Sequence, residues 1–141
     1  SQLIQKLSTE IKKRNLFRPT APVVLKENAE KYFHLKKSLM NCYLHMATTA
    51  TPKDEFLNNI KGVVHIDNSS RVQICDENLL LGKILMNLKK FNIEMIANTS
   101  FNISSDPMVY DKEDAFLAIE RMNIKYLLTE TGLYLRKNEI H

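Results

Sequence analysis

With 141 residues the chain is about one domain in length, long enough to bury a core but too short for two domains. Its 44% hydrophobic and 26% charged residues are typical of a soluble globular protein, and no apolar stretch approaches the roughly 18 residues that span a bilayer. The net charge of +4 is modest, but a basic cluster over residues 12–18 either holds phosphates or nucleic acid or is the solvated face of a helix.

The cysteine and histidine content argues against a metal site in this chain. Cys42 and Cys75 form no close pair, and the four histidines are scattered, so no ligand spacing typical of zinc is present. We therefore expect reduced thiols and a cytoplasmic protein without a signal peptide. Because the sequence begins with Ser1 rather than Met, we also expect either a piece of a longer protein or a processed protein.

The first half of the chain is predicted to mix short helices and strands. Apolar residues at helical spacing predict an amphipathic helix over residues 2–13, and the prolines that follow require extended backbone over 17–22. The next predicted elements, in order, are a strand at 23–25, a helix at 27–33 and a strand at 42–47, which leads into a Thr-rich loop ending at Pro52.

A β-hairpin and a longer helix are predicted next. The apolar segments 63–66 and 71–74 flank the turn-forming residues 67–70, a pattern typical of a hairpin with a four-residue turn. Apolar residues then keep helical spacing over about 77–91, which predicts an amphipathic helix.

The pentapeptide at residues 98–102 (NTSFN) is the first candidate binding segment. It follows the apolar run 93–97, which predicts a buried strand with a polar loop at its carboxyl end. Ligands of open α/β sheets usually bind at that edge, and two Asn amides and two hydroxyls offer donors and acceptors to a small polar ligand. The alternative is a turn in which Asn and Ser cap their own backbone.

The last third predicts a helix followed by two strands. Asp111 is placed as the N-cap of a helix that runs to about Met122, with the acidic Asp114 three positions on. Strands at 124–128 and 133–136 are joined through Gly132. Helices that alternate with strands and hairpins predict an α+β or mixed-sheet α/β fold.

Three segments together resemble the C-terminal domain of the NodU/CmcH family of O-carbamoyltransferases. Residues 11–22 (IKKRNLFRPTAP) are similar to the family's Lys-x-Arg-Glu-x-Phe-Arg-Pro-Phe-Ala-Pro. Residues 65–73 (HIDNSSRVQ) are similar to its His-Val-Asp-Gly-Thr-Ala-Arg-Val-Gln. The third segment is 98–102, from which the likeness continues to residues 135–137. The three segments follow the family's order and cover nearly the whole chain.

This resemblance implies a fold and a function. The fold would be a YrdC-like twisted mixed sheet flanked by helices, a single domain over residues 1–141. In the family this domain binds ATP, with Mg²⁺, and carbamoyl phosphate, and forms carbamoyl adenylate. A larger N-terminal transferase domain of the same parent chain holds a metal and passes the carbamoyl group to a small-molecule hydroxyl acceptor. That domain has no counterpart in this sequence, so we expect it as the partner, and we expect neither a membrane nor nucleic acid.

The resemblance also implies candidate site residues. Lys12 and Arg18 match positions expected to grip phosphate groups, which suits cations that hold anionic reactants. Arg71 matches the arginine of the carbamoyl phosphate and adenylate site. The polar side chains of the third segment would bond the carbamoyl group or the phosphates, and Arg71 and Asn102 are the implied catalytic residues. The segment's binding residues are Asn98, Ser100 and Asn102.

Further candidates and departures from the family pattern leave alternatives open. His65 and Asp67 either bind ligand or order the turn. Asn68 replaces the glycine of that turn but tolerates positive φ, and Thr20 replaces an aromatic residue. The same sequence is compatible with a nucleotide- or RNA-binding module without chemistry of its own, or with a domain that only supports its partner.

Overall fold

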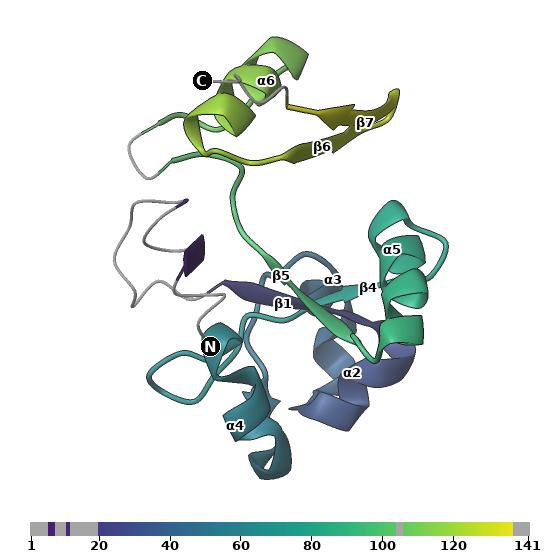
Figure 1. The fold of residues 1–141 in the computed structure, drawn as a ribbon. Helices are drawn as coiled ribbons and strands as arrows, with labels where there is room; N and C mark the ends of the chain where they lie inside the picture. Colours follow the sequence, from purple (N-terminus) through teal and green to yellow (C-terminus); the bar gives the residue numbers. More distant parts are fainter. Residues whose placement is uncertain (1–5, 8–10, 12–19, 104–105, 137–141) are drawn as a thin grey trace. The chain divides into compact units, whose positions relative to one another are not determined.

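The computed structural model describes residues 6–7, 11, 20–103 and 106–136 (Figure 1). The chain forms two compact units, one of residues 17–99 (with Ser1) and one of residues 2–16 and 100–141. The predicted helix at 2–13 falls largely outside the described residues, and the predicted single domain over 1–141 stays a prediction. Among the described helices, each is too short or too polar to traverse a lipid bilayer.

A three-stranded mixed sheet forms the centre of the first unit. Strand β1 (Ala21–Leu25) lies between β4 (Gln73–Cys75), which is parallel to it, and β5 (Met95–Asn98), which is antiparallel. All of β1 is buried, as its apolar sequence requires for a central strand. The predicted strands at 23–25 and 93–97 are therefore confirmed, but β5 is a half-buried edge strand rather than a buried one.

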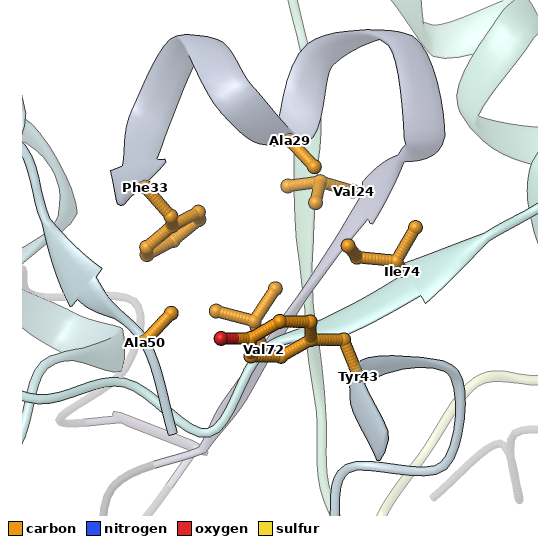
Figure 2. Packing of buried hydrophobic residues seen from close by; sticks show 7 residues of the cluster. All are labelled: Val24, Ala29, Phe33, Tyr43, Ala50, Val72 and Ile74. Atoms are coloured by element: carbon orange, nitrogen blue, oxygen red, sulfur yellow. The ribbon is translucent and has the colours of Figure 1, made fainter. Parts of the chain in front are cut away.

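Helices cover both faces of this sheet. The helix α2 (Lys26–Tyr32) was predicted at 27–33, and it packs with α3 (Met40–Leu44) on one face. On the other face α5 (Leu80–Leu88) places Leu85 against β1 and β4. Seven buried side chains fill the core on the α2 and α3 side (Figure 2): Val24, Ala29, Phe33, Tyr43, Ala50, Val72 and Ile74.

The predicted strand at 42–47 is wrong, because this segment contains α3 and a turn. Leu39, Met40 and Tyr43 follow helical spacing, and all three pack on the core cluster. Helical geometry turns these side chains to one side, whereas a strand would point Met40 and Tyr43 to opposite faces. The short strands that flank this region, β2 (Phe33–His34) and β3 (Thr51–Pro52), pair with each other.

The predicted hairpin of 63–66 with 71–74 is also wrong, although its turn forms. Val63 of the first arm ends a 3₁₀ turn that follows α4 (Leu57–Ile60), residues 64–66 form no strand, and β4 pairs with β1 instead. The Ser70 backbone exchanges two 2.8 Å hydrogen bonds with Ala50, and its hydroxyl donates to the Val63 carbonyl at 2.8 Å. The second arm runs into β4, which pairs with the buried strand β1, and this long-range pairing replaces the predicted hairpin ladder.

The second unit confirms the predictions for the end of the chain. Helix α6 (Lys112–Arg121) begins after Asp111, whose carboxylate accepts from the Asp114 N–H at 2.8 Å. Strands β6 (Tyr126–Thr129) and β7 (Gly132–Leu135) form an antiparallel hairpin that packs on α6 through Leu127. In the first unit, the helix predicted over residues 77–91 is also confirmed. It consists of α5 followed by a 3₁₀ turn that ends at Phe91. The fold is a mixed α+β fold, as predicted.

Candidate functional site

The candidate residues fall in different parts of the chain. Lys12 and Arg18 lie outside the described residues. The first unit contains His65, Asp67, Arg71 and Asn98, and the second contains Ser100 and Asn102. The pentapeptide is therefore divided between the units, and each half has its own surroundings. The ligand-binding roles of all these residues stay predictions.

Asn98 joins the third segment to the second through an amide pair. It is the last residue of β5, and its Nδ2 donates to Oε1 of Gln73 at 2.7 Å and contacts Sδ of Met46 at 3.5 Å. Gln73 begins β4, on the other side of β1, so this hydrogen bond spans the central strand. The register, with Ala21 opposite Asn98 and Val23 opposite Gln73, locates the amide pair at the amino end of β1.

Gln73 is a candidate that the sequence reasoning missed. It closes the second segment, two positions after Arg71, and is the first residue of β4. Its neighbours Val72 and Ile74 are buried in the core on the opposite face. A polar residue that alternates with buried ones was the available signal, because it predicts a side chain that points away from that core.

Two buried hydroxyls lie at the same end of the sheet. Thr20 precedes Ala21 and Thr99 follows Asn98, so the antiparallel register continued by one step places them opposite each other. In the described part of the chain both Oγ1 atoms are buried and lack a hydrogen-bond partner. Buried polar atoms are nearly always paired in folded proteins, so these two hydroxyls are exceptions among the described residues.

Arg71 is presented to solvent by a rigid backbone. The Val72 N–H donates to the Ser70 carbonyl at 3.1 Å, which closes a three-residue turn centred on Arg71, and both flanking residues are buried. The Arg71 side chain is exposed, and among the described residues no carboxylate forms an ion pair with it. Its guanidinium is therefore available to an anion, which is the group it is best shaped to bind.

The opposite end of the sheet is unsuited to anions. There the parallel strands β1 and β4 end at a cavity of about 290 Å³ lined by Leu25, Lys26, Glu27, Asp76 and Glu77. Three carboxylates and one ammonium group give it a net negative charge, which repels phosphates. Because β5 runs antiparallel to β1, Asn98 lies away from this edge, and the expectation drawn from open parallel sheets does not hold for it.

His65 and Asp67 order the turn that precedes Arg71. The His65 carbonyl accepts from the Asn68 N–H at 3.0 Å, and Asn68 has a φ of 59°, so the replacement of glycine by Asn is accommodated as expected. Oδ1 of Asp67 accepts from the Ser69 N–H at 3.0 Å. Hydrogen bonds from the Ser69 side chain and backbone hold the pKa of the Asp67 carboxyl below its usual value. A ligand role for either residue stays a prediction.

In the second unit Asn102 borders a small cavity. Its Nδ2 donates to the Asp106 carbonyl at 2.8 Å, and the Asp106 carboxylate forms an ion pair with Nη1 of Arg121 at 3.3 Å. These three residues line a cavity of about 200 Å³ whose other walls include Ile103, Met108, Val109 and Leu117. Within the described ranges, no group of three or more His, Cys, Asp or Glu is arranged to hold a metal ion.

The amide pair gives a direct test of this geometry. Asn98→Ala and Gln73→Ala should each lower the free energy of unfolding, and in the double mutant the losses should be less than additive by about 1 kcal/mol, because they share one hydrogen bond. Urea unfolding of the four proteins measures this coupling. Asn87→Ala is the control, because the Asn87 amide bonds the Lys83 carbonyl, and its effect should add to that of Gln73→Ala. Full additivity for Asn98 and Gln73 would contradict the geometry.

Comparison with known proteins identifies the family. The family described as carbamoyltransferase C-terminus matches residues 1–136. An uncharacterized protein of Methanocaldococcus jannaschii is 32% identical over 135 residues, which are 94% of this chain and 22% of that protein. The nodulation protein NolNO of Sinorhizobium fredii is 28% identical over 135 residues, 94% of this chain and 19% of its own length.

A third relative is similar over most of this chain. The nodulation protein NolO of Bradyrhizobium diazoefficiens is 28% identical over 114 residues, 78% of this chain and 20% of that protein. The chain thus spans about a fifth of the length of these curated relatives. The resemblance inferred from the three segments is confirmed, and the chain belongs to the family of carbamoyltransferase C-terminal domains.

Proposed function

We propose that this chain is the carbamoyl-adenylate-forming domain of an O-carbamoyltransferase, which binds ATP with Mg²⁺ and carbamoyl phosphate. Membership of the carbamoyltransferase C-terminal family over residues 1–136 supports this function. The transfer to a hydroxyl acceptor is assigned to the remainder of the parent chain, since this chain spans about a fifth of the curated relatives.

The observation that carries the proposal is the convergence of the three segments at the amino end of β1. The first segment supplies Thr20 and runs into β1 at Ala21, the second supplies Arg71 and Gln73, and the third supplies Asn98 and Thr99. These segments are far apart in the sequence and meet within one unit. Their residue types suit an anionic ligand with polar edges: a cation without an ion pair among the described residues, two amides, and two buried hydroxyls without a partner in the same part of the chain.

The proposed reaction needs this kind of site. Water hydrolyses carbamoyl phosphate to carbamate and inorganic phosphate. A carbamate oxygen then attacks the α-phosphorus of ATP, and pyrophosphate leaves. Both reactants are anions, so the protein must neutralise charge and align them, and no side-chain nucleophile is required. In this proposal Arg71 binds the phosphoryl oxygens, and the amides of Asn98 and Gln73 orient the carbamoyl group. The expected phosphate-binding roles of Lys12 and Arg18 stay part of the proposal, and they carry none of the argument from geometry.

Titration of the full-length parent protein tests the proposal. Isothermal calorimetry should show submillimolar binding of ATP with Mg²⁺ and of carbamoyl phosphate, and pyrophosphate should be released from ATP only when carbamoyl phosphate is present. Inorganic sulfate at equal concentration is the control for a nonspecific anion site. Absence of binding by either ligand would overturn the proposal, and RNA binding without either ligand would instead favour a module without chemistry.

A further inference from the structure

The β6–β7 hairpin of the second unit is apolar on both faces. Its inner face packs Leu127 and Tyr134 against α6, which lies along one side of the hairpin in Figure 1. Its outer face presents four large apolar side chains with exposed fractions of 55%, 49%, 66% and 60%: Tyr126, Leu128, Leu133 and Leu135. Tyr126 pairs with Leu135 and Leu128 with Leu133, so the four side chains form one continuous patch.

Strands with this pattern are normally buried on both sides. An antiparallel hairpin with one face in water alternates apolar and polar residues, whereas a strand covered on both faces is apolar throughout. The outer patch exposes on the order of 400 Å², since a large side chain carries roughly 200 Å² and about half of each is open. Lys125 and Glu130 border it, and an apolar centre with a polar rim is typical of an interface.

We propose that this outer face is the docking surface for the polypeptide that precedes this region in the parent chain. The matched family is described as a C-terminus, and the curated relatives are about five times as long as the matched region, so additional chain is available to cover the patch. This inference depends on the relatives' length and on the apolar face, and not on the carbamoyl chemistry.

The size of the patch favours a covalently linked partner over a second copy of the chain. Stable association of separate proteins buries roughly 800 Å² on each partner, about twice what the patch offers. A segment of the same polypeptide docks at an effective concentration in the millimolar range and therefore needs less buried area. The interface between domains of one chain is accordingly smaller than that of an obligate dimer.

Photo-crosslinking in the full-length parent protein tests this surface. With p-benzoylphenylalanine in place of Tyr126, irradiation followed by mass spectrometry should identify crosslinks to residues that precede this region. The matched control places the same group at Tyr110, an exposed tyrosine of the same unit that is outside the hairpin. We expect the crosslink yield at Tyr126 to be about tenfold higher than at Tyr110, as a desolvated contact requires.

Three results would overturn the inference: crosslinks from Tyr126 to residues 17–99, crosslinks between isotopically distinguished copies, or a yield no higher than at Tyr110. A second measurement guards against disruption of docking by the crosslinking group at Tyr126. The cysteine introduced by Leu133→Cys should react with a maleimide about tenfold more slowly than the cysteine introduced by Leu79→Cys, because the docked segment must dissociate before the thiol is labelled. The two leucines are similarly exposed, at 66% and 59%, so equal rates would also reject the docking surface.

Discussion

Arg71→Ala should weaken binding of carbamoyl phosphate to the full-length protein by about 10- to 100-fold, because a hydrogen bond to a charged group contributes roughly 1.5–3 kcal/mol. The side chain is exposed and has no carboxylate partner within the described part of the chain, so an anionic ligand would be its principal partner. For the same reason the free energy of unfolding should change by less than about 0.5 kcal/mol. Calorimetric titration and urea unfolding measure the two quantities separately.

Two variants make the Arg71 result specific. Arg71→Lys should recover only part of the affinity, because an ammonium group keeps the charge but loses the bidentate geometry of the guanidinium. Lys37→Ala removes an exposed cation from a 3₁₀ turn of the same unit and should leave affinity unchanged. Loss of binding in both alanine variants would point to general electrostatic attraction. Unchanged binding in Arg71→Ala would remove Arg71 from the site.

Gly82→Ala should destabilise the protein by about 3 kcal/mol, the upper part of the usual range for forcing extra atoms into a packed interior. A Cβ at position 82 would lie 2.0 Å from the Asp76 carbonyl oxygen and 2.7 Å from Cα of Glu77. Both atoms belong to the backbone that enters α5, so no side-chain rotation relieves the overlap. Urea unfolding of the variant and of the unsubstituted protein measures the loss in the free energy of unfolding.

This prediction opposes the one that helix propensity makes. Alanine is favoured over glycine in a helix interior by about 1 kcal/mol, so propensity alone predicts that Gly82→Ala stabilises the protein. Lys83→Ala, at an exposed position on the same helix, should change stability by less than about 0.5 kcal/mol. A stability gain in Gly82→Ala would show that α5 does not approach the Asp76 backbone so closely.

Elements that local interactions determine were predicted correctly. Helix α6 has its N-cap within its own first turn, where Asp111 bonds the Asp114 N–H. The β6–β7 hairpin follows from apolar strands joined by a two-residue loop, and α2 and α5 begin and end within a few residues of their predicted bounds. Capping, helical spacing and tight turns act over a few residues, so sequence patterns reveal them.

Elements that distant partners determine were predicted wrongly or not at all. The segment around Tyr43 is helical because it packs on a core assembled from β1, α2 and β4. Residues 63–66 form no strand, because their expected partner enters β4 and pairs with β1. Short apolar runs fit either a helix or a strand, and only their tertiary contacts decide between them.

The candidate site also has features that the sequence predicted and features that required the tertiary structure. The sequence alone determined the family, through three segments in register, and it named Arg71 and Asn98 as ligand-binding candidates. Only the tertiary structure brought the end of the second segment to the start of the third, through the hydrogen bond from Asn98 to Gln73. The physical reason is that this contact depends on β4 and β5 flanking β1 in opposite directions, and strand order and direction are set by long-range pairing that no local pattern encodes.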